Sequence, residues 1–509
     1  MFNRISTTEK RSARRSFLPL TISATAAVAL AGCGGSGGNS NGNSNLVNTG
    51  ATIAQPGWGV NKTATVQPSK QWTFLVYMNG ANDLDTDAIT NIHQMESIGS
   101  TDAVNVVVQF KRGQGFDSNT QQTFDTSNGG WSGTRRYYIT KDGDQNNINS
   151  VLLSTNSALD MGDWHSLQAF VQWGIQTYPA QRYCLVVWNH GSGWRAEPIG
   201  KTGTRNVLTS RKTTGRGVSF DDVSGNYILS TQLAQAIDMG SGRKWDLLAW
   251  DCSLMQMIEN DYEIKDKTQY IVGSEESPPG SGYPYDTILA DLNANPGMNG
   301  KAYGSDIAQK TLDFFVANPY SGQSATGSTV IVAPNHLTQS VVDSSQLTGV
   351  ASAIDNLGKV LTGAQSRYAI QIAQARGASD EYGVYDLSPS DPTFQFYQSY
   401  RDPVDFVHEL IDTLPGATGP LVPDGGVQSA ANGVRNAINS AVVFNVAGSQ
   451  HSGSHGLSLY LPTPSDYALD DKTQAGGTAF GYGTNIRYTD LAFARAVPNW
   501  QSFLVNAAQ

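Results

Sequence analysis

Residues 183–188 read Tyr-Cys-Leu-Val-Val-Trp and run directly into Asn-His-Gly at 189–191. An almost unbroken apolar run of this length is typical of a parallel strand that is covered on both faces. Further runs share this character, at 72–78, 104–110, 245–250 and 270–273. Helical patterns separate them, at about 85–97, 164–178, 230–238 and 253–265. Because strands and helices alternate, we predict an α/β fold with a mostly parallel sheet flanked by helices.

The pattern continues beyond residue 290 with less regularity. A helix is expected at 301–316, a strand at 327–333, and helices at 402–414 and 426–441. This order fits either further α/β layers or a second domain packed against the first. We therefore expect a C-terminal α/β region over residues 321–509, in which no pattern of residues points to catalysis.

Composition excludes several classes of protein. The chain has 509 residues, of which 33 are Lys or Arg and 43 are Asp or Glu, with a formal net charge of −10. With 39% hydrophobic and only 15% charged residues, it is neither an acidic disordered chain nor a coiled coil. An acidic chain lacks the basic surface that nucleic acid requires, so we expect no nucleic-acid partner. The 3 cysteines cannot build a disulfide framework.

Residues 1–32 have the pattern of an export signal. The pair Arg14-Arg15 precedes a mostly apolar stretch at 20–31, which is too short and too polar to span a bilayer stably. That stretch ends in Leu30-Ala-Gly-Cys33, which resembles a bacterial lipobox and implies cleavage before Cys33 and lipid attachment to it. The Gly-, Ser- and Asn-rich segment that follows predicts a tether over 33–70. We expect an exported, lipid-anchored protein of the bacterial cell envelope, by the Sec or the twin-arginine route.

Two strand ends carry residues suited to acyl transfer. In parallel sheets, ligands bind outside the carboxyl ends of the strands. His190 and Gly191 follow one predicted strand, and Asp251-Cys-Ser253 follows another. Acyl transfer needs a base that reaches the proton of a nucleophile, and backbone N–H groups that approach the developing oxyanion. The pattern favours His190 as the base and Gly191 as an oxyanion donor, although a structural role in a loop would also explain His190.

Several segments resemble, in the same order, blocks of the clostripain-like cysteine peptidases. They are Trp72-Thr-Phe-Leu-Val-Tyr-Met-Asn-Gly-Ala-Asn-Asp-Leu84, Leu185-Val-Val-Trp-Asn-His-Gly-Ser-Gly-Trp194, Arg216-Gly-Val-Ser-Phe-Asp-Asp-Val-Ser-Gly-Asn-Tyr227, Asp251-Cys-Ser-Leu-Met255 and Gly273-Ser-Glu-Glu-Ser-Pro-Pro-Gly-Ser-Gly-Tyr-Pro-Tyr285. The resemblance covers roughly residues 70–290. It implies a caspase-like peptidase domain over 71–320, which cuts peptides or proteins after Arg or Lys.

The block around the nucleophile departs from the family. There the family reads Asp-Ala-Cys-Leu-Met, so on residues 251–255 Ser253 takes the place of the catalytic Cys and Cys252 takes that of Ala. Side chains alternate along a strand, so Asp251 and Ser253 should point one way and Cys252 the other. Three hypotheses remain open. Ser253 attacks, or Cys252 attacks from a rearranged turn, or the chemistry is lost and the chain is a catalytically degenerate module that binds peptides or proteins.

The resemblance also implies how a substrate is selected. Asp251 matches the acid of the specificity pocket, which pairs with a basic side chain; its alternative role is to cap a helix at 253–265. Ser281 falls near a second acid of some relatives and brings no charge of its own. The loop 195–216 is rich in Lys and Arg, and is either a solvated loop or the site of self-cleavage that some relatives have.

No cofactor is predicted. Residues 142–146 match only the start of a calcium loop, and 221–226 read as a turn, so calcium, which some relatives use, has no clear motif here. His451 and His455 are spaced like ligands on a helix but lie among Gly and Ser, which disfavours a metal site.

Overall fold

The computed structural model describes residues 57–60, 66–113, 116–117, 122–123, 126–194, 217–323, 329–383, 399–412, 422–464, 467 and 486–507. All of them belong to one compact unit, Gly50–Gln509. The predicted export signal, the lipidation site Cys33 and the basic loop 195–216 lie outside the described residues. Within the described ranges, no helix is long and apolar enough to cross a bilayer.

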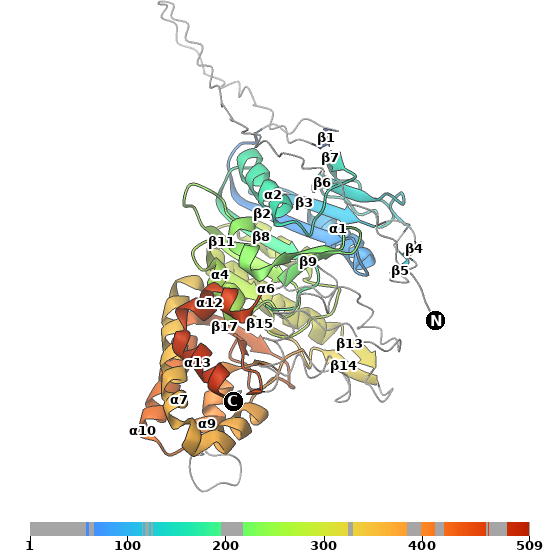
Figure 1. Ribbon diagram of the computed structural model, residues 1–509. Coiled ribbons are helices and arrows are strands. Elements are labelled where there is room, and N and C mark those ends of the chain that lie inside the picture. The colour runs from blue at the N-terminus through green and yellow to red at the C-terminus, as the bar shows by residue number, and fades with distance from the viewer. Residues whose placement is uncertain are drawn as a thin grey trace, which may run out of the picture. The chain divides into compact units, whose positions relative to one another are not determined.

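A ten-stranded sheet forms the centre of this unit, in the order β1-β7-β6-β3-β2-β8-β11-β12-β15-β17 (Figure 1). Neighbouring strands in its middle are parallel, namely β3 (Val104–Arg112), β2 (Lys70–Gly80), β8 (Ala180–Trp188), β11 (Trp245–Asp251) and β12 (Thr268–Gly273). These strands contain the apolar runs of the sequence. The predicted α/β fold with a mostly parallel sheet is therefore confirmed.

Antiparallel strands complete the sheet at both edges. One edge holds β6 (Gly133–Tyr138), β7 (Val151–Asn156) and β1 (Gly59–Val60). The other holds β15 (Thr338–Asp343) and β17 (Val442–Ala447), which follow residue 320 in the chain and extend the same sheet. Short strand pairs lie outside it: β4 (Phe116–Asp117) with β5 (Gln122–Thr123), β9 (Gly217–Asp221) with β10 (Asn226–Leu229), β13 (Tyr320–Gln323) with β14 (Thr329–Ala333), and β16 (Tyr400–Arg401) with β18 (Leu459–Tyr460).

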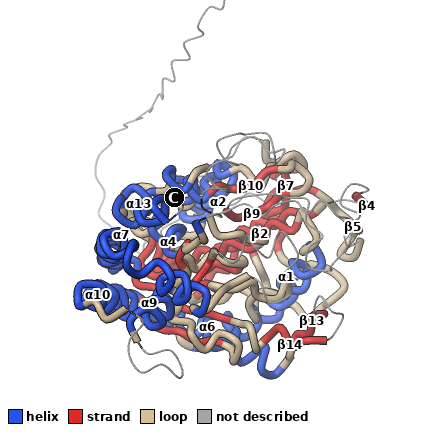
Figure 2. The backbone as a smooth tube through the Cα atoms, turned by 60° about the horizontal axis from the view of Figure 1, so that its bottom comes forward, coloured by secondary structure: helices blue, strands red, loops and turns tan. Residues whose placement is uncertain are grey.

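Side chains of the parallel strands alternate between two hydrophobic cores, one on each face of the sheet. One core is covered by α1 (Asp85–Ile98), α5 (Tyr285–Ala294) and α6 (Gly300–Ala317). The other is covered by α2 (Trp164–Thr177), α4 (Ile258–Ile264) and the C-terminal helices α7 (Leu347–Ala378), α9 (Pro403–Ile411), α10 (Gly425–Ala441), α12 (Ala492–Ala496) and α13 (Pro498–Ala507). Figure 2 shows α7, α9, α10 and α13 gathered beside the strands, in agreement with their mutual contacts.

Two predicted helices differ from the structure. In place of a helix at 230–238 there are a 3₁₀ turn (Ser230–Gln232) and the short α3 (Leu233–Ala236). The helix expected at 253–265 begins only at Ile258, because Leu254 has a φ of 63°, which an α-helix cannot accommodate. The segment between β11 and α4 is therefore not helical, and it lies at the carboxyl end of the sheet, where a site is expected.

Candidate active site

The loops that follow β8 and β11 meet at the carboxyl end of the sheet. The two strands are parallel neighbours, and the backbone N–H of Asn189 continues their ladder by donating to the carbonyl of Asp251 at 3.2 Å. Gly191 lies so close that a Cβ added there would stand 2.3 Å from the carbonyl oxygen of Ser253. Only glycine allows this approach. The structure thus brings the predicted His190-Gly191 and Asp251-Cys-Ser253 segments together.

Cys252 points into the hydrophobic core. Its side chain is 2% exposed, and its Sγ donates to the backbone carbonyl of Val187 at 2.8 Å. Burial raises the pKa of this thiol well above its usual value, so it stays protonated at neutral pH. A buried thiol that is already bonded to a backbone carbonyl is a poor nucleophile. This orientation gives no support to the hypothesis that Cys252 attacks.

Ser253 takes the opposite orientation and bonds a second hydroxyl. Its Oγ accepts a hydrogen bond of 2.8 Å from the Oγ of Ser277, in the loop that follows β12. The turn around it is fixed by backbone bonds, from Leu254 N to Glu276 O at 3.2 Å and from Gln256 N to Ser274 O at 3.1 Å. Because α4 begins at Ile258, the prediction that Asp251 caps a helix starting at 253 is wrong.

His190 is paired with a carboxylate that sequence reasoning missed. Its Nε2 lies 2.5 Å from Oδ1 of Asp83, in the loop between β2 and α1, and the histidine is 7% exposed. A carboxylate on one ring nitrogen selects the tautomer and stabilises the imidazolium when the other nitrogen takes a proton. A signal for Asp83 was present, since it closely follows β2, the parallel neighbour of β8, and lies in the first block of the family resemblance.

Neighbouring residues hold the His190 loop on both sides. The side chain of Asn189 donates to the carbonyl of Asn79 and accepts from the backbone N–H of Phe220 at 2.7 Å. Further along, the hydroxyl of Tyr400 donates to the carbonyl of Ser192 at 2.8 Å. These bonds fix the backbone on either side of His190, which preorganises the ring and the N–H of Gly191.

Asp251 lies beside the Gly280-Ser-Gly282 turn. Its Oδ2 accepts from the hydroxyl of Tyr285 at 2.8 Å and from the backbone N–H of Tyr283 at 3.2 Å. Burial raises the pKa of this carboxyl to about 7. A Cβ at Gly282, whose φ is 65°, would stand 2.7 Å from the same oxygen, so the turn lies directly against the carboxylate.

A second carboxylate, Asp87 of α1, approaches the same turn from its other end. A Cβ at Gly280 would stand 3.1 Å from Oδ2 of Asp87. Burial is the larger cause and the charge of Asp83 the smaller one; together they raise the pKa of Asp87 to about 6. One helical turn further on, Asn91 donates to the carbonyl of Ser281 at 2.9 Å and ties α1 to the turn. Sequence reasoning missed Asp87, because its place on a helix gave no motif.

Ser281 therefore lies between two acids. In the described part of the chain, no ion pair with a basic side chain is formed by Asp87 or Asp251, and the charge of Asp87 itself helps to raise the pKa of Asp251. Carboxyls whose pKa values are raised in this way can accept a cation, because a bound cation favours the charged form of both. The arrangement is suited to a cationic side chain of a ligand.

The described residues contain no group of His, Cys, Asp and Glu arranged to hold a metal ion. The two histidines considered as ligands bind acids instead. His451 Nδ1 lies 2.9 Å from Asp380 Oδ1, and His455 Nδ1 lies 3.2 Å from Asp402 Oδ1. In the segment compared with a calcium loop, the side chain of Asn147 donates to the carboxylate of Asp144 at 2.9 Å, and that of Asn149 donates to the carboxylate of Asp142 at 2.7 Å.

Comparisons with known proteins agree with this fold. The family model for the clostripain family matches residues 76–489. Clostripain of Hathewaya histolytica is 23% identical over 440 residues, which cover 79% of this chain and 77% of that protein. An inactive zymogen C11 protease of Parabacteroides distasonis has a TM-score of 0.54 at 18% identity, covering 85% of this chain and 99% of its own. A secreted C11 cysteine protease of Bacteroides thetaiotaomicron, bound to an irreversible peptide inhibitor, has a TM-score of 0.50 at 19% identity, over 77% of this chain and 93% of its own. The caspase-like fold expected from the resemblance is confirmed.

Proposed function

The chain belongs to the clostripain family, and on that premise we propose that it cleaves peptide bonds after basic residues with Ser253 as nucleophile. The contact between His190 and Asp83 carries this proposal. A serine hydroxyl is far less acidic than a thiol, so it needs a stronger base than a cysteine peptidase does. A histidine backed by a carboxylate is the base that serine peptidases use.

In the proposed reaction, Ser253 attacks the carbonyl carbon of the scissile bond and passes its proton to His190. Asp83 stabilises the imidazolium that forms, and the N–H of Gly191 donates to the oxyanion. His190 then gives the proton to the leaving amine, and an acyl group remains on Ser253. Water, deprotonated by His190, attacks that acyl group, and the new carboxylic acid leaves as His190 returns its proton to the oxygen of Ser253. The hydrogen bond from Ser277 leaves the proton of Ser253 available for His190 and stabilises charge on its oxygen.

Selection of a basic residue is assigned to Asp251 and Asp87, on either side of Ser281. A guanidinium or ammonium group beside the Gly280-Ser-Gly282 turn would bind both carboxylates through charge-assisted hydrogen bonds. Asp87 of α1 would then supply the negative charge that Ser281 lacks. The substrate would be a peptide or protein with an accessible Arg or Lys.

Location outside the cytoplasm follows from the N-terminal pattern. The signal-like residues 1–32 and the lipobox-like Leu30-Ala-Gly-Cys33 support an exported protein held at a membrane by lipid on Cys33. A relative of the same fold is described as secreted. Mass spectrometry of the mature N-terminus tests this proposal; a diacylglyceryl group on Cys33 is the expected result, and an uncleaved N-terminus contradicts it.

Hydrolysis of fluorogenic peptides ending in Arg, Lys or a neutral residue tests the peptidase proposal. The full chain is compared with Ser253→Ala, Cys252→Ala and His190→Ala. We expect activity on the basic substrates that is lost in Ser253→Ala and His190→Ala and kept in Cys252→Ala. Loss in Cys252→Ala with retention in Ser253→Ala would overturn the assignment of the nucleophile.

The second candidate is a module that binds peptides without cleaving them. The substitution of Ser253 for the family's cysteine favours it, because the hydroxyl is the weaker nucleophile. A wild-type chain that binds Arg-ended peptides but hydrolyses none, and that gains activity in Ser253→Cys, would establish this alternative.

A further inference from the structure

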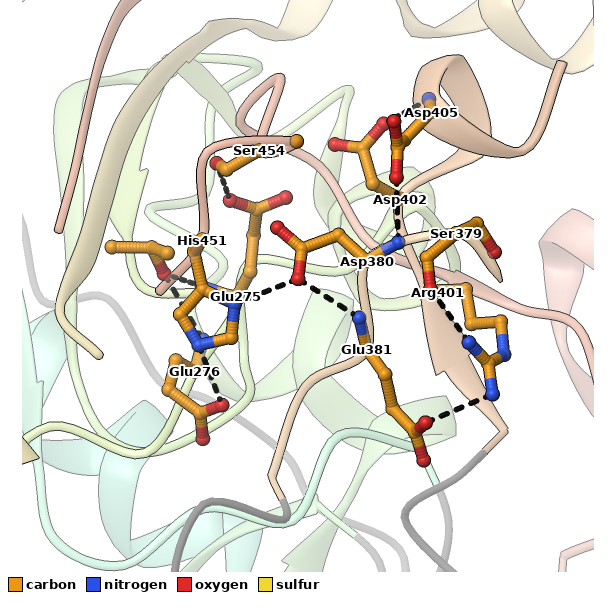
Figure 3. Close-up of polar contacts among 12 residues, drawn as sticks. Glu275, Glu276, Ser379, Asp380, Glu381, Arg401, Asp402, Asp405, His451 and Ser454 are labelled. Atoms are coloured by element: carbon orange, nitrogen blue, oxygen red, sulfur yellow. Dashed lines mark hydrogen bonds and ion pairs between the residues drawn. The ribbon is translucent and has the colours of Figure 1, made fainter. Parts of the chain in front are cut away.

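A buried cluster of ionic side chains includes Glu276, the residue that precedes Ser277 in the chain (Figure 3). Its central members are Glu276, in the loop after β12, Asp380, after α7, and His451, after β17. These residues come from segments that are far apart in the chain. The cluster therefore joins the loop beside the nucleophile to the region beyond residue 320.

His451 is the cation between Glu276 and Asp380. Its Nδ1 lies 2.9 Å from Oδ1 of Asp380 and its Nε2 lies 3.2 Å from Oε2 of Glu276. Burial alone would lower the pKa of His451, but the contacts with both carboxylates outweigh it and raise the pKa to about 10. The histidine and Glu276 are only 4% and 1% exposed. A buried charge of this kind is tolerated because it is paired on both sides, and removal of one partner is costly.

Glu276 connects His451 to the nucleophile through two further sets of bonds. Its carboxylate accepts from the backbone N–H of Gly383 at 2.8 and 2.9 Å and from the backbone N–H of Ser277 at 2.6 Å. Its own carbonyl accepts from the N–H of Leu254 at 3.2 Å, next to Ser253. One side chain therefore fixes the backbone of Ser277, while the main chain of the same residue fixes the turn that bears Ser253.

The contacts form a continuous path from His451 through Glu276 and Ser277 to Ser253. The last step is the 2.8 Å hydrogen bond from Ser277 Oγ to Ser253 Oγ. A hydrogen bond of this kind acts only if the donor is held in place, and side chains around a reactive group must be fixed to a fraction of an ångström.

We propose that Glu276 is a positioning residue for the nucleophile at position 253, and that His451 holds it, so that the region beyond residue 320 completes the site. This inference rests on the proposed function only in taking position 253 as the reactive one. It assigns no proton transfer to Glu276 or His451.

The test measures the reactivity of a thiol at position 253 and needs no turnover. The full chain carrying Ser253→Cys is alkylated with iodoacetamide, and the rate at that position is followed by site-resolved mass spectrometry across a range of pH. Cys184 and Cys252 are buried, so their peptides serve as internal references. Into this background we introduce Ser277→Ala, Ser277→Thr, His451→Gln and Glu276→Gln. His408→Gln is the matched control, because its exposed ring also pairs with an acid, Asp412, at 2.5 Å.

We expect Ser277→Ala and His451→Gln each to slow alkylation about tenfold at neutral pH and to raise its pH midpoint by about one unit, since the thiolate loses a hydrogen bond. The double variant should be no slower than either single variant, because both act through one contact. Ser277→Thr, which keeps the hydroxyl, should restore the rate, and His408→Gln should leave it unchanged.

Alkylation of His451→Gln at the parent rate would overturn the inference, as would single-variant effects that multiply in the double variant. Should His451→Gln fail to fold by circular dichroism, Glu276→Gln decides on the same criteria. A wild-type chain that cleaves no peptide would refute the proposed function and leave this result standing.

Discussion

Nε2 of His190 and Oδ1 of Asp83 lie 2.5 Å apart, although 106 residues lie between them in the chain. They meet because each follows one of two neighbouring parallel strands, β8 and β2. The contact gives a member of a cysteine peptidase family the histidine–carboxylate pair that a serine nucleophile requires. Ser253 and Asp83 are therefore best understood together, since a hydroxyl nucleophile needs the stronger base that a carboxylate on His190 provides.

Removal of the Asp83 charge should reduce activity without unfolding the protein. We expect Asp83→Asn to lower kcat/KM by about 10²–10⁴-fold, because the imidazolium of His190 loses its stabilising charge. Asp163→Asn is the matched control, since Asp163 pairs with the exposed His165 at 2.8 Å. Equal kcat/KM values for Asp83→Asn and wild type would show that the carboxylate has no part in catalysis.

Cys252 should matter for stability and not for activity. We expect Cys252→Ala to lower the free energy of unfolding by roughly 1–2 kcal/mol, because it removes a buried sulfur and its bond to Val187. Its kcat/KM should stay near that of wild type. Urea unfolding and peptide hydrolysis measure the two quantities, with Cys184→Ala as a second buried thiol for comparison. A Cys252→Ala variant that is stable and inactive would contradict the core orientation.

Asp87 should select basic residues, and an acid placed at position 281 should be able to replace it. We expect Asp87→Ser to raise KM for Arg-ended peptides about tenfold or more, because one charge-assisted hydrogen bond is lost. The double variant Asp87→Ser/Ser281→Asp should recover much of the loss, since the new acid stands on the Gly280–Gly282 turn that both carboxylates approach. Peptides ending in a neutral residue serve as the control. If Arg- and neutral-ended peptides lose affinity equally, Asp87 is a structural residue.

Binding of a basic side chain should release protons. The pKa values of Asp87 and Asp251 are raised to about 6 and about 7, and a bound cation favours the charged form of each. Affinity for an Arg-ended peptide should therefore rise between about pH 5 and pH 8, as the free carboxyls become charged. Calorimetry with Ser253→Ala, which prevents cleavage, measures it. A citrulline-ended peptide, similar in shape and uncharged, should bind without this dependence, and identical profiles for both peptides would argue against a carboxylate pocket.

The His451 ion pairs should stabilise the fold most at low pH. The pKa of this histidine is raised to about 10 from its usual 6.5, so the folded state binds the proton more tightly than the unfolded chain does. Its contribution is fully present below the unfolded pKa and is lost as the pH rises through the folded one. Between these two values, the free energy of unfolding should fall less steeply in His451→Gln than in wild type. Parallel curves in urea titrations would show that His451 is not protonated in the fold.

The sheet and the orientation at the nucleophile followed from local patterns. The apolar runs at 183–188 and 245–250 became β8 and β11, and strand alternation correctly predicted that Cys252 and Ser253 point in opposite directions. Both results depend on the two-residue period of a strand, which is encoded in consecutive residues. The long helix α7 was missed, because its many Gly, Ala and Ser residues weaken the apolar pattern, and its stability comes from packing against α10 and α13.

By itself, then, the sequence determined the strands, the family and the exchange of serine for cysteine. Only the tertiary structure decided which distant side chains meet at the site: Asp83 on His190, Ser277 on Ser253, Asp87 beside Ser281. These contacts join residues from separate loops and a helix, and no periodic pattern records them. They arise because the carboxyl ends of parallel strands lie at one edge of the sheet. The loops that follow these strands pack against each other there, although they are far apart in the sequence.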